Sequence, residues 1–421
     1  MHAWRTRICN LVIALAVTKG AAVFWASMGF QILRLHRFFG QGLAMQDPGC
    51  PMAFCDFSVF WLAGRLGSAQ GPDVMYDPAK FFPAAMRMLP HQIANLPFMY
   101  PPPMLPVTYL ISRPNLAAGY FLFCAASIFL AILLLRASKI SWFAIAAALL
   151  GPAGVWCLYL GQFSVLCAAL LIAGLAQLEA RPATGGALLG ALFIKPQYAA
   201  LAPILLICRR DRRALAGAFA MLAILLALSL FCYGPQSWTG FLGHGRAEMR
   251  LWLESPYGNN HEMMGTSIFW MARSLGAGLP FAYAMQTLTE AFAAICAWQL
   301  WRVRDFGGEV RIAITICLCL LASPYSHTAD MVGFCAACAM LMRRATPMTN
   351  AMLAVLWISP NYIGHFALKF GFLPTPLCII AAALIGWRQL GLETMPASKV
   401  TSGRRFAPVL SLGQNPFHRF R

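Results

Sequence analysis

Apolar segments separated by short polar stretches run along most of the chain. We expect ten of them to form membrane-crossing helices, at 8–30, 116–136, 141–158, 162–178, 214–232, 280–302, 308–323, 328–342, 347–363 and 373–388. A helix needs about 20 mainly apolar residues to cross the hydrocarbon core of a bilayer, and most of these segments approach that length. The pattern therefore predicts an all-α polytopic membrane protein with about ten transmembrane helices.

One further apolar stretch, 185–208, departs from this pattern because Lys195 and Pro196 interrupt its middle. Basic residues flank it at both ends, so both ends are expected on the same side of the membrane. Proline lacks the N–H that a helix interior needs, and its ring clashes with the preceding turn. We expect two half-helices that meet near Lys195, a broken helical hairpin in addition to the spans.

Two longer polar stretches, 31–115 and 233–279, separate the apolar segments. Alternation of the spans places both on the outer side, as the first and second outer loops. The first is rich in proline and aromatic residues, and its most apolar part, 100–112, is too short for a full span. We expect this loop to form short helices that lie along the membrane surface.

Composition agrees with a membrane protein, and the distribution of charge gives its orientation. Of the 421 residues 60% are hydrophobic and only 11% are charged, against about 25% charged in soluble domains. The net charge is +18, but Lys and Arg gather in short runs between apolar segments, as cytoplasmic loops do. This distribution argues against a nucleic-acid partner. We expect one integral membrane domain, 1–388, with the N-terminus and a basic tail, 389–421, in the cytoplasm.

Fourteen cysteines occur in the chain, and most lie in apolar segments, where cysteine packs as a small hydrophobic residue. We find no arrangement of Cys and His that indicates zinc, and no metal is expected. Only Cys50 and Cys55 share a polar loop. They would be able to pair in an oxidising compartment, and the sequence leaves this open.

This topology sorts the polar residues by depth. Asp56, Tyr100, Gln162 and the stretches 259–264 and 323–330 fall at the outer face. Lys195 approaches that face from within the membrane. Polar and charged groups at such depths are costly to place, so these residues are candidates for function.

Asp56 stands at the head of an apolar stretch, CDFSVFWLAGR at 55–65, in a chain with only 14 acidic residues. Phe57, Phe60 and Trp61 follow at the spacing of one helix face, and we expect them to anchor the helix in the membrane interface. Asp is also a preferred N-cap residue. The carboxylate is therefore a helix cap, a catalytic base, or both.

Two cationic candidates lie far apart in the sequence. Lys195 is distant from both basic flanks, so it is a poor candidate for a lysine that reaches the interface from a helix end. We expect it to bind phosphate or to line a cavity. His327 follows the Ser323-Pro324 turn and is either a helix cap or a group that binds phosphate or assists proton transfer.

Three other residues are candidates for contact with substrate. Tyr100 and Gln162 contact sugar or have an architectural role. His261 and the neighbouring Glu262 have the chemistry to bind an acceptor or a metal, but two such residues without a third ligand are weak evidence for metal. A solvated loop is the alternative for this pair.

Four motifs together resemble a known family. They are DFSVFWLAGRLGSAQGPDVMYDP, YPPPMLPV, the run from LGQFSVL to FIKPQ, and SPYSH, in this order between about 55 and 330. Each motif alone is weak, but their order and spacing resemble the polyprenol-phosphate-mannose-dependent mannosyltransferases of glycosyltransferase family 87, which have the GT-C fold.

The resemblance implies a multi-pass enzyme of the inner, cytoplasmic membrane. Such an enzyme moves a sugar, here expected to be mannose, from a polyprenyl-phosphate donor to a hydroxyl of a lipid- or glycan-type acceptor on the periplasmic side. The donor is a substrate, and no cofactor is expected. Family members carry a catalytic aspartate in the first outer loop, which by motif position is Asp56. Lys195 and His327 are the residues we expect at the donor phosphate.

The chemistry needs a base for the acceptor hydroxyl and fixed positive charge for the leaving phosphate. A retaining route would need two close carboxylates, and no second carboxylate is near Asp56 in the sequence. A single carboxylate suits inversion at the sugar carbon. The main alternative is a transporter or flippase of lipid or polyprenyl phosphate, since transporters also contain broken helices. A transporter of that type would show paired breaks in two similar halves, and we find one clear break. A structural membrane subunit would not need the polar residues at the outer face.

Overall fold

The computed structural model describes residues 55–89, 96–258, 262–302 and 308–393, with a few isolated positions between 22 and 33. Within these ranges the regular secondary structure is helical, and the β contact is an isolated bridge between Gly265 and His327. The expected first span lies almost wholly outside the described residues, as does the expected tail from 394 onward.

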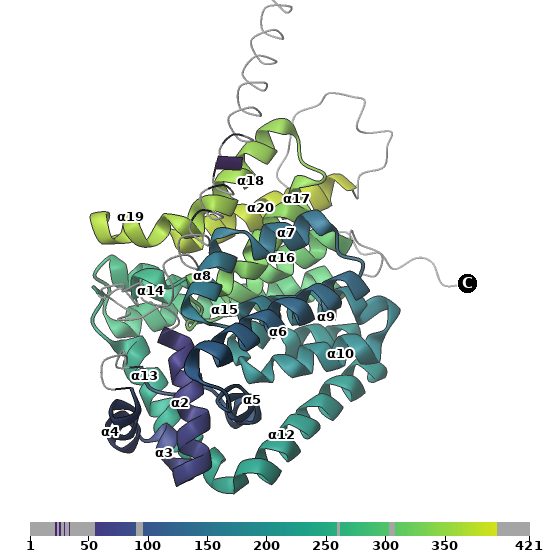
Figure 1. The fold of residues 1–421 in the computed structure, drawn as a ribbon. Coiled ribbons are helices and arrows are strands. Elements are labelled where there is room, and N and C mark those ends of the chain that lie inside the picture. The colour runs from purple at the N-terminus through teal and green to yellow at the C-terminus, as the bar shows by residue number, and fades with distance from the viewer. Residues whose placement is uncertain are drawn as a thin grey trace, which may run out of the picture.

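The described part of the first outer loop forms short helices that gather at the lower left of Figure 1. None is long and apolar enough to cross a membrane, which agrees with the short helices expected here. Asp77 caps one of them by accepting a hydrogen bond from the backbone N–H of Ala79. The helices are α2 (Cys55–Gln70), α3 (Asp73–Tyr76), α4 (Pro78–Met88) and α5 (Leu105–Ile111).

By length and composition, two helices in the described ranges are able to cross a membrane, and bent pairs raise this number to four. The two are α6 (Leu116–Ala137) and the continuous segment Arg212–Glu254. One bent pair is α7 (Trp142–Leu149) with α8 (Pro152–Leu160), at 49°. The other joins Pro347–Asn361, which contains α18 (Pro347–Ile358), to α19 (Ile363–Phe370), at 69°. The expected total of about ten spans stays a prediction.

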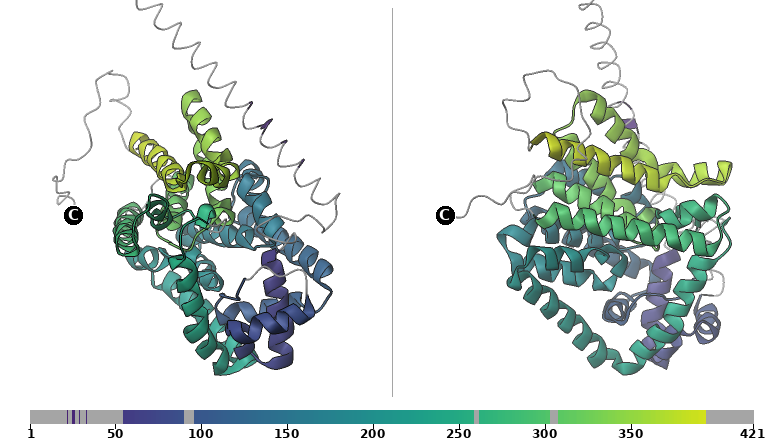
Figure 2. Two further views of the ribbon diagram at one scale, coloured as in Figure 1. Left: turned by 90° about the vertical axis from the view of Figure 1, so that its left-hand side faces the viewer. Right: turned by 180° about the vertical axis from the view of Figure 1, so that it is seen from behind.

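The helical body consists of neighbouring helices with similar directions (Figures 1 and 2). The helix α6 packs against α9, and α16 packs against α15, α17 and α20. The longest helix, α12, runs obliquely along one side and packs against α10. The bounds of these helices are α9 (Ser164–Ala180), α10 (Pro182–Ala191), α12 (Arg212–Gly240), α15 (Leu279–Arg302), α16 (Gly308–Leu321), α17 (Val332–Met342) and α20 (Thr375–Glu393).

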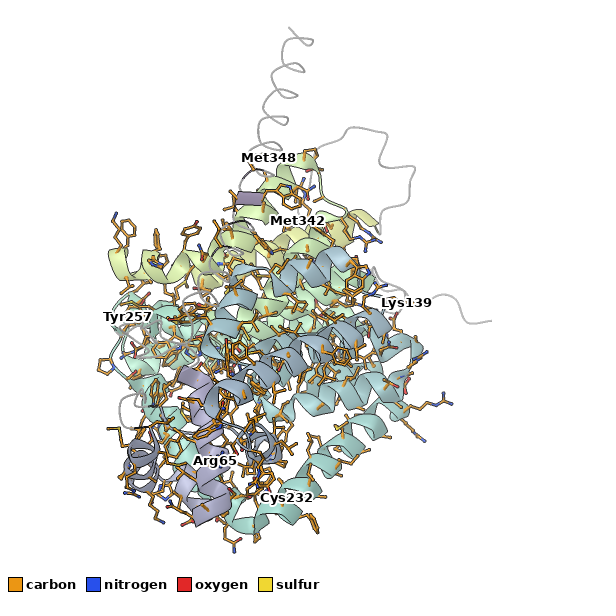
Figure 3. The ribbon with its side chains drawn as sticks, viewed as in Figure 1. Arg65, Lys139, Cys232, Tyr257, Met342 and Met348 are labelled. Carbon is orange, nitrogen blue, oxygen red and sulfur yellow. The ribbon has the colours of Figure 1, made fainter. Side chains whose placement is uncertain are left out.

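The ends of α6 and α9 lie close together at one end of this body. The backbone carbonyl of Ala137, at the end of α6, accepts a hydrogen bond from Gln177 near the end of α9. Lys139, two residues after Ala137, therefore lies near the end of α9, and Figure 3 shows it on the opposite side of the molecule from Tyr257. We call these two sides the basic end and the Tyr257 end.

The stretch 233–279 was expected to be a loop, but most of its described part is helical. The helix α12 continues past 232, bends at Gly234, where φ is 66°, and ends at Gly240. The π-helical η5 (Phe241–Gly245), α13 (Arg246–Glu254) and α14 (Ile268–Ser274) follow. A positive φ suits glycine, and Pro235 then fits the first turn of the continuing helix. Gly234-Pro235, a pair that is typical of loops in a sequence, therefore produces a kink within a helix here.

The hairpin breaks where the sequence predicts it. The helix α10 tightens into a 3-10 turn, Leu192–Ile194, and a second 3-10 turn, Pro196–Ala199, leads into α11 (Ala202–Arg209). Lys195 stands between the turns with non-helical φ and ψ of −141° and 79°.

Both ends of this hairpin lie at the basic end of the body. The guanidinium of Arg209, at the end of α11, lies 3.2 Å from the carboxylate of Glu179, just before α10 begins. Arg311 of α16 contacts the same carboxylate. The chain therefore enters the body from one side, turns at Lys195 and returns to that side.

Two glycines allow α10 and α12 to lie very close together. A Cβ atom on Gly186 would clash with the backbone carbonyl of Ala214, and one on Gly217 would clash with that of Ala183. Small residues at helix contacts are the usual means by which membrane helices approach closely. This contact fixes the first arm of the hairpin against the long helix.

Candidate active site

A cavity of about 580 Å³ lies beside the N-terminal end of α2. Its wall is formed by α2, the segment 96–101, the α8–α9 turn, the hairpin break, α13, and residues 322–330. Most of the wall is apolar, including Met99, Trp156, Phe241, Met249 and Trp252. The charged and polar side chains in the wall include Asp56, Tyr100, Gln162, Lys195, His327 and Asp330.

Gln162 connects the carboxylate of Asp56 to the ammonium of Lys195. Its Nε2 donates to Asp56 Oδ2 at 2.8 Å, and its Oε1 accepts from Lys195 Nζ at 3.2 Å. The Tyr100 hydroxyl donates to the same Oε1 at 3.0 Å. An ammonium group only donates, so Lys195 fixes the amide with its oxygen toward the lysine and its N–H toward Asp56.

Lys195 is deeply buried and fully hydrogen-bonded. Its Nζ lies 2.6 Å from Asp330 Oδ1 and 2.8 Å from Ser164 Oγ, in addition to Gln162. The side chains of Lys195 and Asp330 are each 3% exposed. Because an ammonium has three protons, these three acceptors use all of them. Binding of a donor phosphate by Lys195 would require it to release one acceptor.

Tyr198 and Asp330 attach the hairpin break to its neighbours. The Tyr198 hydroxyl lies 3.0 Å from the Asp330 carbonyl and 3.3 Å from the Ser164 carbonyl. Ser164 begins α9, and its hydroxyl donates to Asp330 Oδ1 at 2.8 Å. The two half-helices thus meet against buried polar groups, as irregular backbone in a membrane protein requires.

The segment that carries Asp330 is held by a capping box. Asp330 Oδ2 accepts from the backbone N–H of His327 at 3.0 Å, at the start of the 3-10 turn Thr328–Met331. The Thr266 N–H donates to the Ser326 carbonyl beside the Gly265–His327 bridge. These bonds confirm that His327 caps a helical turn, one of the two roles expected for it.

The ring of His327 lines the cavity in a defined tautomer. Its Nδ1 lies 2.9 Å from the Tyr325 carbonyl, which only accepts, so Nδ1 carries the proton. Burial lowers the pKa of His327, although the charge of Asp330 opposes this. The neutral ring therefore has an acceptor at Nε2, and donation to a phosphate would need the protonated form.

Burial also determines the basicity of Asp56. It raises the pKa of the Asp56 carboxyl to about 6, against the lowering effects of the Gln162 hydrogen bond and the Lys195 charge. A carboxylate of this kind is ionised at neutral pH and is more basic than an ordinary aspartate. Both properties suit a general base.

The aromatic side chains that follow Asp56 have a different environment from the one expected. Phe57, Phe60 and Trp61 are 0%, 1% and 8% exposed, so they pack within the protein and do not face the membrane interface. The ring of Phe60 lies 4.8 Å from that of Tyr100 and 5.8 Å from that of Phe163, centroid to centroid. These rings hold α2 and the cavity wall together from the protein side.

The structure brings five of the six candidate residues together. Asp56, Tyr100, Gln162, Lys195 and His327 line one cavity, and His261 lies outside the described residues. Glu262 is buried, and its Oε1 accepts a hydrogen bond from Ser255, so a solvated loop is wrong for this residue.

Two members of the polar cluster were not predicted, Ser164 and Asp330. Both stand in stretches that contain predicted site residues, Ser164 directly after LGQF and Asp330 at the end of SPYSHTAD. The spacing of three residues from His327 to Asp330 is that of a capping box and was the available signal. Within the described ranges no group of three or more His, Cys, Asp or Glu residues is placed to hold a metal ion.

Comparison with known proteins identifies the family. No curated protein and no solved structure matches the chain. The family model of glycosyltransferase family 87 matches residues 98–324, just over half of the chain. The match includes Tyr100, Gln162 and Lys195, whereas Asp56 precedes it and Asp330 follows it. The helical membrane architecture agrees with this match, and the chain belongs to glycosyltransferase family 87.

Proposed function

We propose that this membrane glycosyltransferase transfers mannose from a polyprenyl-phosphate donor to a hydroxyl of a lipid- or glycan-type acceptor, with inversion at the sugar carbon. In this proposal the protein has the GT-C fold and resides in the cytoplasmic membrane, with the cavity open to the periplasmic side. The basic end, which includes Lys139 and Arg209, then faces the cytoplasm, as the positive-inside rule favours.

The observation that carries the proposal is the place of Asp56 in the cavity. One carboxylate oxygen accepts from Gln162, while the carboxylate as a whole lines the cavity. The raised pKa of Asp56 makes it a suitable acceptor for the proton that the attacking hydroxyl loses. The new glycosidic bond then forms on the face of the sugar opposite the leaving phosphate.

The rest of the wall suits a lipid-linked donor. Met99, Phe241, Met249 and Trp252 provide an apolar surface for an isoprenoid chain, and thioether side chains adapt easily to an irregular chain. Lys195 and His327 are our candidates for the donor phosphate. His327 would bind it in the protonated form, and Lys195 would exchange its contact with Ser164 for a phosphate oxygen while it keeps Asp330 and Gln162.

The proposal is tested with purified protein in lipid nanodiscs, labelled polyprenyl-phosphate-mannose and a panel of hydroxyl acceptors. We expect transfer by the wild type and a decrease in kcat of about 10²- to 10⁴-fold for Asp56→Asn, the usual contribution of a general base. The matched control is Asp73→Asn, because Asp73 is an exposed carboxylate near Asp56 in sequence that pairs with Lys80.

Full activity of Asp56→Asn would overturn the assignment of the base. Movement of polyprenyl-phosphate-mannose across the bilayer of proteoliposomes, without transfer to any acceptor, would support the flippase alternative. Transfer of glucose in preference to mannose would retain the reaction class and change the sugar.

A further inference from the structure

The buried ion pair between Lys195 and Asp330 is connected to Asp56 through one amide group. We propose that Ser164, Lys195 and Asp330 are a positioning unit for Asp56. In this unit Asp330 neutralises Lys195, and Lys195 holds Gln162 with its N–H toward the carboxylate. The inference rests on the proposed function, in which Asp56 is the base.

The first step of the argument is orientation. A glutamine amide is able to present either its oxygen or its nitrogen to a neighbour, and a carboxylate needs the nitrogen. Lys195 Nζ lies 3.2 Å from Gln162 Oε1 and so excludes the flipped amide. Asp56 Oδ2 is then bound at 2.8 Å, and the direction of its other oxygen is set with it.

The second step is charge balance. A lysine next to an aspartate makes that aspartate a weaker base, because the opposite charge stabilises the ionised form. Here the ammonium lies 2.6 Å from Asp330, and its hydrogen-bonded link to Asp56 runs through the neutral amide of Gln162. The negative charge of Asp330 thus offsets part of the effect of Lys195 on Asp56.

The third step is rigidity. Asp330 Oδ2 accepts from the His327 N–H, and the Asp330 carbonyl accepts from Tyr198. Ser164 contacts both charged partners, at 2.8 Å each. These bonds hold Asp330 in one place, so the position of Lys195 is fixed independently of any ligand.

Among the residues that the structure describes, four charged or titratable groups are arranged around Asp56. Lys195 and Asp330 act on it from across the cavity, and Tyr100 acts from the adjoining wall. His327 lines the same cavity. A change in the titration of Asp56 is therefore assignable to these groups.

The test is the effect of two substitutions on the protonation of Asp56. In Asp330→Asn the charge of Lys195 is no longer balanced, so the midpoint of the Asp56 titration should fall by about one pH unit. In Gln162→Met the hydrogen bond that stabilises the carboxylate is lost, so the midpoint should rise by a similar amount, about one unit. Structural damage alone would not shift the midpoint in opposite directions.

The midpoint is read in two ways. The acid limb of kcat/KM against pH reports it in the working enzyme, and kcat should also fall by roughly 10- to 100-fold in both variants. Infrared titration of the protonated carboxyl band, assigned by its loss in Asp56→Asn, reports it without turnover. The second readout separates a failure of this inference from a failure of the proposed function.

A double variant protects the test against misfolding of Asp330→Asn, which leaves a buried ammonium unbalanced. Lys195→Met with Asp330→Asn removes both charges and one of the donors that fix Gln162, and it retains an acceptor for the His327 N–H, so the midpoint of Asp56 should lie at or above that of the wild type and not below it. Wild-type midpoints in Asp330→Asn and Gln162→Met, or a double variant shifted as far as Asp330→Asn, would overturn the inference.

Discussion

At the scale of the residue, the site contains two carboxylates, Asp56 and Asp330, that have different hydrogen-bond partners. Asp330 binds Lys195 directly, whereas Asp56 accepts from a neutral amide and has a pKa of about 6. Asp56 was identified from the sequence because it heads an apolar stretch within a family-like motif, and Lys195 because it is a charged residue inside an apolar stretch. Ser164 and Asp330 were missed as site residues because only the folded chain shows that they bind Lys195.

The pKa of Asp56 predicts the pH dependence of the reaction. The ionised carboxylate is the active form, so kcat/KM should rise tenfold per pH unit below about pH 6 and level off above it. The measurement is the initial rate of sugar transfer between pH 4.5 and 8. An acid limb near pH 4 would mean that Asp56 is not desolvated in the working enzyme.

Tyr100 offers a graded test of the same hydrogen-bond chain. Tyr100→Phe removes one of the two donors to Gln162 Oε1 and leaves Lys195 in place. Loss of one such bond costs about 1 kcal/mol, so kcat should fall by roughly fivefold. Tyr109→Phe, at an exposed tyrosine of α5, is the control and should behave as the wild type. A loss as large as that of Asp56→Asn would give Tyr100 a direct role in the reaction.

At the scale of the element, the broken hairpin was predictable and the shape of α12 was not. Lys195-Pro196 in an apolar stretch with two basic flanks allows few other structures. Gly234-Pro235 has the same composition as a turn, but here it is a kink within a helical segment that continues to Glu254. The difference lies in tertiary packing, because η5 packs against α3, and Phe241 of η5 and Trp252 of α13 line the cavity.

The contact between α10 and α12 should be sensitive to a single methyl group. Gly217→Ala places a Cβ against the Ala183 carbonyl and should lower the free energy of unfolding by about 1–3 kcal/mol, as overpacking does. Gly364→Ala in α19 is the matched control, because its Cβ meets nothing within 4 Å. Thermal unfolding in detergent measures both. Equal transition temperatures for the two variants would contradict the close helix contact.

At the scale of the whole molecule, Arg209 and Arg311 meet Glu179 at one end of the body, and this contact relates the charge pattern of the sequence to the orientation of the hairpin. Charge runs predicted which segments share a side, and the contact of Glu179 with Arg209 and Arg311 bears this out for the hairpin. Charge runs and helix lengths do not give the same number of spans, because several apolar helices here are short or bent.

Glu179 should contribute more to stability than an ordinary surface acid. Glu179→Ala removes the carboxylate that contacts two arginines, of which Arg311 is 3% exposed, and should cost about 1–3 kcal/mol after allowance for the partial exposure of Glu179. Glu309→Ala breaks the more exposed pair with Arg343 and should cost at most about 1 kcal/mol. Chemical denaturation of the two variants compares them directly. A larger loss for Glu309→Ala would mean that the Glu179 contacts do not fasten the hairpin.

Labelling from one side of the membrane tests the orientation. In a background with Cys50→Ser, Cys55→Ser and Cys232→Ser, Pro256→Cys beside Tyr257 should react with an impermeant maleimide applied from the periplasm. Ala137→Cys at the basic end should react only after the membrane is permeabilised. The reverse pattern would invert the proposed topology.

The ion pair between Lys195 and Asp330 also has a consequence for the biogenesis of the protein. The two residues are 135 positions apart, so at about 5–20 residues per second the lysine is synthesised roughly 7–27 s before its partner. During that interval the hairpin contains an amine without its carboxylate, and such a group resists entry into the bilayer. Lys195 is therefore expected to wait in a hydrated or chaperoned state, and the arrival of α17 completes the insertion of a helix pair made far earlier.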